Sequence, residues 1–329
     1  MSAVSTAPEA STVLLESFDG KAESRSFRFS ELETVIRADT SDQVAPAFKE
    51  VEQAVARGKH AAGIVSYEAA SGLNPNHVTA EQGELPLLWF GIFGERTEFS
   101  SDLPETGDTI CTVTPPKLSI SSRNYRDAVE KIRCAIARGE TYQTNFTSRQ
   151  RFHISGTPFT LYRRMCRNQK ASYCAWIDIG THQILSASPE LFFALSGNRL
   201  TMKPMKGTAE RLPQACADLL QQERLKNSPK EQAENLMIVD LVRNDLSMIA
   251  ETGTVRVPAL FEVETFPTVH QMTTTVTADI RPTTGLLDIF RALFPCGSVT
   301  GAPKLRTMGI IRELEEEPRG VYCGAIGYV

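Results

Sequence analysis

The sequence has little of what marks membrane, secreted or nucleic-acid-binding proteins. The longest apolar run of the 329-residue chain, 85–93, is far shorter than the about 20 residues that span a bilayer. Residues 1–10 lack a basic start and an apolar stretch, so we expect a frayed tail and no signal peptide. A net charge of −4, with acids and bases interspersed, gives no electrostatic case for nucleic acid or an anionic membrane as a partner.

Paired cysteines are also missing. The seven cysteines are scattered and form no Cys-x-x-Cys motif, which argues against a zinc site and against a disulfide framework. A reducing, cytoplasmic location is therefore expected. There is no internal repeat, and the length allows one large unit or two domains.

What is present is a mixture of helical and strand patterns. Apolar spacing predicts helices over 42–57, 125–138, 215–226, 230–250, 286–293 and 303–317. β-Forming residues predict strands over 13–17, 61–67, 87–93, 140–146, 173–179, 183–188, 191–196, 200–202, 255–257, 269–280 and 322–329. Ser, Thr, Asp and Pro dominate 100–116, which predicts a boundary between subdomains 1–117 and 118–329. The irregular order of strands and helices favours an α+β fold over a Rossmann or barrel fold.

The segment from Lys203 to Thr208 contains the first candidate for chemistry. We expect Lys206 at the end of the strand 200–202, just before Gly207 and a Thr208 that starts a helix. Lysine becomes a nucleophile when burial or a neighbouring cation such as Lys203 holds it neutral. The alternative is a solvated cation, which is the commoner role of a single lysine.

Two carboxylates, Glu231 and Glu234, lie three residues apart near the start of the helix 230–250, so both project from one face. The spacing is compatible with a magnesium site, in which carboxylate oxygens leave positions for water and a substrate anion. The alternative is that the helix dipole alone favours acids here. Further along this apolar helix, charges such as Asp245 should be paired.

A glycine-containing loop, 296–304, runs into the next predicted helix. Free backbone N–H groups at such a place bind anions, and Lys304 would add positive charge. The loop lacks the form of a nucleotide P-loop and suits a carboxylate at least as well as a phosphate.

Glu190 follows Ser188 and Pro189 in a turn between two predicted strands. Its apolar neighbours could raise its pKa and make it a general acid, although a turn glutamate in water is the commoner situation. His270 lies in a strongly patterned strand, where a single histidine is more often structural.

In this order, the segments resemble the chorismate-utilising enzymes, which include anthranilate, aminodeoxychorismate, isochorismate and salicylate synthases. The resemblance runs from about Leu118 to Val329. It is carried by Gly139-Glu140-Thr141-Tyr142-Gln143, Ser188-Pro189-Glu190, Met205-Lys206-Gly207-Thr208, Ala233 to Asp245, Gly297 to Lys304 and Arg319 to Tyr328. Residues 63–70 and 86–90 resemble the short aminodeoxychorismate synthases more loosely.

Two positions distinguish the branches of this family. The anthranilate synthases carry alanine before Gly-Thr, whereas the aminodeoxychorismate branch carries lysine, here Lys206. The water-using enzymes carry a catalytic lysine after Gly-Glu-x-Tyr, whereas the ammonia-using enzymes carry glutamine, here Gln143. Both residues imply amination of chorismate to 4-amino-4-deoxychorismate, the first step towards 4-aminobenzoate and folate.

The resemblance implies a large fold of two packed, mostly antiparallel sheets flanked by helices. It implies Lys206 as the nucleophile, Glu190 as the acid and Gln143 at the ammonia position. Magnesium would bind to Glu231 and Glu234. Chorismate would contact Thr208, Gly297, Ser298, Thr300, Gly301, Ala302, Lys304, Tyr322 and Tyr328. Ammonia would come from a glutamine amidotransferase subunit, because nothing in the chain resembles a glutaminase Cys-His pair.

Some positions depart from the family pattern. The anthranilate branch has a histidine where this chain aligns Gln271, beside His270, so no catalytic histidine is assigned. The family continues beyond Val329 into a strand and a helix that supply an arginine and a further glutamate. The sequence therefore predicts either a fragment of a longer polypeptide or an incomplete site. Anthranilate synthase component I, and an inactive chain that only binds the amidotransferase, remain the alternatives.

Overall fold

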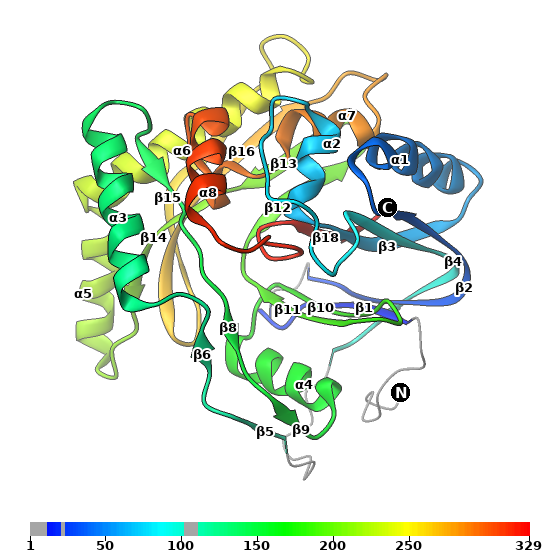
Figure 1. Ribbon diagram of the computed structural model, residues 1–329, viewed down its shortest axis with the longest axis horizontal. Coiled ribbons are helices and arrows are strands. Elements are labelled where there is room, and N and C mark those ends of the chain that lie inside the picture. The colour runs from blue at the N-terminus through cyan, green and yellow to red at the C-terminus, as the bar shows by residue number, and fades with distance from the viewer. Residues whose placement is uncertain (1–11, 21–23, 102–110) are drawn as a thin grey trace.

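Two large antiparallel sheets and the helices around them make up the computed structural model, which describes residues 12–20, 24–101 and 111–329 (Figure 1). The predicted tail 1–10 and most of the predicted boundary segment lie outside the described residues.

The first sheet has seven strands and draws on both ends of the chain. Their order is β11 (Gln183–Ser188), β10 (Tyr173–Asp178), β1 (Val13–Glu16), β2 (Ser26–Ala38), β4 (Leu88–Phe99), β3 (His60–Val65) and β18 (Ala325–Tyr328). Tyr328 of β18 lies opposite Ala62 of β3. The two subdomains predicted from the sequence therefore share this sheet, and the division at residue 117 stays a prediction.

The second sheet has five strands: β12 (Leu191–Ser196), β13 (Arg199–Lys203), β14 (Met205–Glu210), β15 (Arg256–Thr265) and β16 (Val269–Asp279). β13 and β14 pair with successive halves of β16, and Pro204 between them accepts the N–H of Thr274 at 3.2 Å. This continuity corrects the prediction for Lys206: the chain does not leave the strand there, and Thr208 does not start a helix.

Eight helices are described: α1 (Ser41–Ala56), α2 (Ala70–Leu73), α3 (Ser122–Ala137), α4 (Pro158–Gln169), α5 (Ala215–Lys226), α6 (Pro229–Ser247), α7 (Leu286–Leu293) and α8 (Lys304–Leu314). Helix α4 was not predicted, although Thr157 caps the N–H of Thr160 and Pro158 follows at the first position, a typical helix start. No helix in the described part of the chain is long and apolar enough to cross a membrane.

The remaining strands are two residues long: β5 (Thr112–Val113), β6 (Lys117–Leu118), β7 (Gln143–Thr144), β8 (Gln150–Arg151), β9 (Ile154–Ser155) and β17 (Gly301–Ala302). The strand predicted over 140–146 shrinks to β7, because β17, its partner, is itself only two residues long. Likewise, only 325–328 of the predicted strand 322–329 are in β18.

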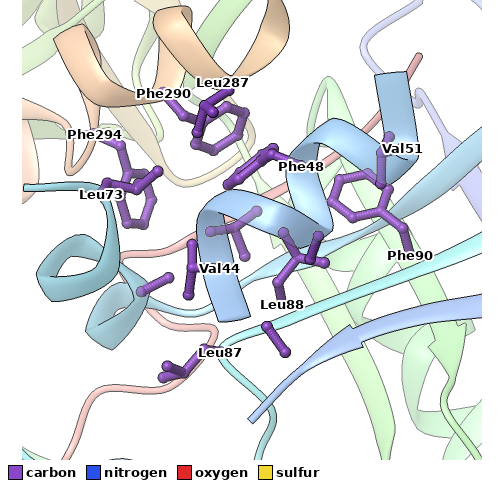
Figure 2. Close-up of a cluster of buried hydrophobic side chains, with 14 of the residues drawn as sticks. Val44, Phe48, Val51, Leu73, Leu87, Leu88, Phe90, Leu287, Phe290 and Phe294 are labelled. Carbon is purple, nitrogen blue, oxygen red and sulfur yellow. The ribbon is translucent and has the colours of Figure 1, made fainter. Parts of the chain in front are cut away.

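Helix α1 fills the space between the seven-stranded sheet and α7. Its Phe48 is fully buried and lies 4.7 Å, centroid to centroid, from the ring of Phe290 (Figure 2). Leu88 and Phe90 of β4 cover the sheet side of the same cluster. Each fully buried side chain of this size contributes about 1.5–3 kcal/mol of transfer free energy.

A second core lies between α6 and the five-stranded sheet, where Ile238 and Val242 pack with Leu200. Phe192 and Phe193 of β12 contact both this core and the one around Phe290. The two layers therefore share apolar contacts at β12, next to the turn that carries Glu190.

Candidate active site

Glu190 lies where the two sheets meet, in the turn between β11 and β12. The Oγ of Ser188 accepts the Glu190 N–H at 3.2 Å, and the Oγ of Ser298 donates to Glu190 Oε1 at 2.5 Å. Burial raises the pKa of Glu190, although Ser298 and the charge of Lys206 oppose the rise. A raised pKa suits a general acid, because the carboxyl group then keeps its proton to higher pH.

Lys206 projects from β14 and interacts electrostatically with Glu190. Burial lowers the pKa of Lys206, while the negative charges of Glu190 and Glu234 raise it. Lys203 was expected to help keep Lys206 neutral, but its ammonium group pairs with Glu264 at 2.7 Å. Burial, and not a neighbouring cation, is the cause of the lowered pKa.

The two pKa shifts act in the same chemical direction. A raised pKa at Glu190 favours the protonated acid, and a lowered pKa at Lys206 favours the free amine. Both shifts have the same main cause, because burial penalises the charged form of each group. A free amine beside a protonated carboxyl group is the state that a nucleophile and a general acid require.

The sequence analysis missed Asn235, which holds the backbone of Lys206. Its amide is buried, donates to the Lys206 carbonyl oxygen at 3.4 Å and accepts the hydroxyl of Thr274 at 2.6 Å. One side chain of α6 thereby connects β14 with β16. An asparagine next to Glu234, on the side of the helix where Ile238 and Val242 are apolar, was the available signal.

Glu231 and Glu234 lie in the first two turns of α6, which Ser228 caps. Gly207 on β14 has φ +97°, and a Cβ built there would be 3.3 Å from Glu231 Oε2. A glycine at this position therefore lets the carboxylate approach the strand that carries Lys206.

The same two carboxylates already attract a cation within the chain. The Lys230 ammonium group lies 3.3 Å from Glu231 and 3.7 Å from Glu234. Across the described residues, no group of three or more His, Cys, Asp or Glu side chains could enclose a metal ion. The pair fits Mg²⁺ held by one or two carboxylates, with substrate oxygens and water as the remaining ligands.

The predicted glycine loop reaches Gln143 through the β7–β17 pair, in which Ala302 lies opposite Gln143. Gly301 has φ +143°, and a Cβ there would be 2.0 Å from the Gln143 carbonyl oxygen, so a side chain is excluded. The Oε1 of Gln143 is buried and has no hydrogen-bond partner in the described part of the chain. It is an acceptor available to a small donor.

Arg319 is buried and binds the backbone of the glycine loop 296–304. Its guanidinium donates to the carbonyl oxygens of Val299 at 2.7 Å and Asn145 at 2.6 Å, and it pairs with Glu315. The loop and the residue that follows β7 are thus bound to one buried cation.

Two other residues predicted to contact chorismate, Lys304 and Thr300, bond to groups of the protein itself. Lys304 turns inward, where its ammonium group donates to Asp245 at 2.5 Å and to the Leu293 carbonyl at 3.3 Å. Thr300 bonds to the Cys296 carbonyl oxygen at 3.0 Å. The predicted roles of these side chains in chorismate binding stay predictions, but both side chains have partners within the protein.

Thr208, Tyr322 and Tyr328 are exposed. The ring of Tyr328 packs at a tilt against Phe27 of the seven-stranded sheet, 5.1 Å between centroids, and Tyr322 lines a pocket of about 280 Å³ with Arg149. Their substrate contacts stay predictions.

The side chain of His270 bonds within the protein. It is buried, and its Nε2 lies 2.9 Å from Asp218 Oδ1 while its Nδ1 lies 3.0 Å from the hydroxyl of Thr265. Both ring nitrogens are therefore engaged within the protein.

Comparison with known proteins identifies the family of the chain. Residues 104–329 match the family described as chorismate binding enzyme. The chain belongs to this family. Among relatives, aminodeoxychorismate synthase component 1 of Klebsiella aerogenes is 43% identical over 213 residues, covering 65% of this chain and 47% of that protein. Anthranilate synthase component 1 of Aquifex aeolicus (strain VF5) is 35% identical over 211 residues, 64% of this chain and 43% of that protein.

The chain spans about half the length of these curated chorismate binding enzymes. Among solved structures, anthranilate synthase component I from Streptococcus pneumoniae TIGR4 matches with a TM-score of 0.80 and 25% identity, covering 94% of this chain and 81% of that one. The predicted α+β fold of two mostly antiparallel sheets is confirmed.

Proposed function

We propose that this chain carries the catalytic region of an aminodeoxychorismate synthase, which converts chorismate and ammonia to 4-amino-4-deoxychorismate and water. The observation that supports this most directly is Lys206 beside Glu190, with pKa values shifted towards the free amine and the protonated acid. The relatives named aminodeoxychorismate synthase are also more similar to this chain than those named anthranilate synthase.

The reaction has two substitutions. The amine of Lys206 attacks C2 of the ring, the ring double bonds shift, and the C4–O bond breaks as Glu190 protonates the departing oxygen, which leaves as water. Ammonia then bonds to C4, the double bonds shift back, and the C2–N bond to Lys206 breaks, which frees the amine. The new C4 ammonium group gives one proton back to the Glu190 carboxylate and so restores the acid. Dividing one difficult substitution into two through a covalent adduct is ordinary nucleophilic catalysis.

Gln143 would select ammonia as the second nucleophile. Its unpartnered Oε1 can accept a hydrogen bond from ammonia, but an amide cannot act as a base for water at neutral pH. The neighbouring loop 297–302 would contact the substrate carboxylates through its backbone N–H groups.

Glu231 and Glu234 would hold magnesium. The ion, when bound, would neutralise a carboxylate of the substrate and favour charge development at the ring. The chain's contribution is to keep both carboxylates against β14, as the close approach at Gly207 allows.

Ammonia would come from a glutamine amidotransferase, and the designation "component 1" among the relatives implies another component. We place this pathway step, towards 4-aminobenzoate and folate, in the cytoplasm.

Product analysis tests the proposal. The chain is incubated with chorismate, magnesium and an ammonium salt, and the products are separated by chromatography. We expect 4-amino-4-deoxychorismate without pyruvate. Anthranilate together with pyruvate would identify an anthranilate synthase instead, and no turnover, even with the amidotransferase added, would favour a chain that only binds its partner.

A further inference from the structure

Ser298 presents its hydroxyl group to Glu190 and not to open space. Its side chain is buried in the single turn Gly297–Val299, with Oγ 2.5 Å from Glu190 Oε1 and 3.2 Å from Cys296 Sγ. Ser298 Oγ donates to Glu190 Oε1, which can accept either as a carboxylate oxygen or as the carbonyl oxygen of the protonated acid. A lone pair of Ser298 Oγ is then left for the thiol proton of Cys296.

Cys296 is a suitable donor at the other end of this chain of hydrogen bonds. Burial raises the pKa of the Cys296 thiol to about 11, with the charge of Glu190 adding to the rise. The thiol therefore keeps its proton at neutral pH, and the direction of donation runs from Cys296 through Ser298 to Glu190.

The backbone around Ser298 has little freedom. A Cβ at Gly297 would be 2.6 Å from Leu241 Cδ2, so the turn packs directly against α6. Thr300 bonds to the Cys296 carbonyl, and Arg319 donates to the Val299 carbonyl at 2.7 Å. Because the backbone is bonded on both sides of Ser298, its hydroxyl group can fix the rotation of the Glu190 carboxyl group.

We propose that Ser298 is a positioning residue for Glu190, which it holds by Oε1 so that Oε2 carries the proton given to the departing hydroxyl group. This inference rests on the proposed function and gives Ser298 a role other than the substrate contact expected from the sequence. It also accounts for the direction of the Ser298 side chain, which is turned towards the acid.

The first test titrates Glu190 itself, without substrate. Infrared difference spectra against pH identify the carboxyl band of Glu190 by its loss in Glu190→Gln. Because Ser298 stabilises the ionised form, Ser298→Ala should move the titration midpoint to higher pH, Ser298→Cys should give an intermediate shift, and Ser298→Thr should restore the wild-type midpoint.

Ser66→Ala is the matched control. Ser66 is equally buried and donates a short hydrogen bond, 2.6 Å, to the Pro86 carbonyl, but it does not contact Glu190. Ser66→Ala should lose about as much thermal stability as Ser298→Ala, and its Glu190 titration midpoint should equal that of wild type. The proposal is overturned if Ser298→Ala melts like a folded protein and its Glu190 titration midpoint equals that of wild type. This result does not depend on which reaction the chain catalyses, so failure of the proposed function is recognised separately.

Steady-state kinetics with chorismate and ammonia then separate positioning from binding. Ser298→Ala should lower kcat about tenfold, a part of what a general acid contributes, with little change in the KM for chorismate. The descending limb of the pH–rate profile, which Glu190 sets, should move to higher pH, and Ser298→Thr should recover most of kcat. A raised KM with an unchanged kcat would instead make Ser298 a substrate-binding residue and overturn the inference.

Discussion

At the scale of single residues, the neutrality of Lys206 is what distinguishes a nucleophile from a binding cation. Lys206→Ala should abolish the covalent route, and any residual activity should drift towards the 2-amino product, because ammonia would then attack C2 directly. Lys206→Arg should be equally impaired, since a guanidinium group stays protonated. Mass spectrometry of wild-type protein quenched during turnover should find an adduct on the peptide that contains Lys206.

Lys203→Arg is the matched control, because its partner Glu264 can accept a guanidinium as well. It should retain most of the activity. Substantial amination by Lys206→Arg would mean that Lys206 only binds a carboxylate.

The role of Glu190 as the general acid leads to a separate prediction about pH. Activity should fall at low pH, where Lys206 is protonated, and at high pH, where Glu190 has lost its proton, so the profile should be bell-shaped. Glu190→Gln should lower kcat about 100-fold or more and remove the descending limb, because no acid remains to be deprotonated. A descending limb that persists in Glu190→Gln would assign that limb to another group.

At the scale of elements, the first turns of α6 carry the magnesium prediction. Glu234→Gln removes one of two charges and should weaken magnesium binding by at least about tenfold, measured by calorimetry and by the magnesium dependence of the rate. Glu223→Gln, an acid on α5, is the control and should change neither. Equal magnesium dependence in Glu234→Gln and wild type would remove Glu234 from the site.

Helix α5 is fastened by Asp218, which accepts the Leu212 N–H at 2.9 Å and contacts Arg211 and His270. The Leu212 N–H, together with His270 and Arg211, lowers the pKa of Asp218 to about 2. A lowered folded-state pKa gives stability that is complete above the unfolded pKa, about 4, and is lost as pH falls towards 2.

Thermal midpoints should therefore differ between wild type and Asp218→Asn at pH 6 and converge between about pH 4 and pH 2. Asp240→Asn is the control, because Asp240 forms only an exposed pair with Arg243. A difference that persists unchanged at pH 2 would contradict the linkage.

The sequence predicted these elements better than their contacts. Helix α7 was placed at its correct ends, because Gly285 and Pro295 flank a strongly apolar segment. Lys206 was placed at the end of a strand, because Gly207 and Thr208 suggest that a helix follows, whereas β13 and β14 both pair with β16 on either side of Pro204. Partners such as Asn235 for Lys206 and Ser298 for Glu190 lie 29 and 108 residues away, a separation that local patterns do not encode.

At the scale of the whole molecule, the candidate site depends on how two sheets are joined. Glu190 is in the connection between them, and Lys206 belongs to the five-stranded sheet alone. Their relative position is therefore set by the apolar contacts across the junction, where Phe290 lies within 5.9 Å of Phe192 and 5.7 Å of Phe193, ring to ring. The two sheets should consequently unfold together.

The two tryptophans make this testable, because Trp89 and Trp176 both lie in the seven-stranded sheet. Fluorescence thus reports on that sheet, while far-ultraviolet circular dichroism reports on the whole chain, and their denaturant transitions should coincide in wild type. Phe290→Ala should lower stability by about 3–5 kcal/mol and separate the two transitions, because it removes the ring against which Phe192 and Phe193 pack across the junction. Phe93→Ala, a buried ring within the seven-stranded sheet, should cost a similar amount without separating them. If the transitions were already separate in wild type, the sheets would be independent units, and the position of Glu190 relative to Lys206 would need another support.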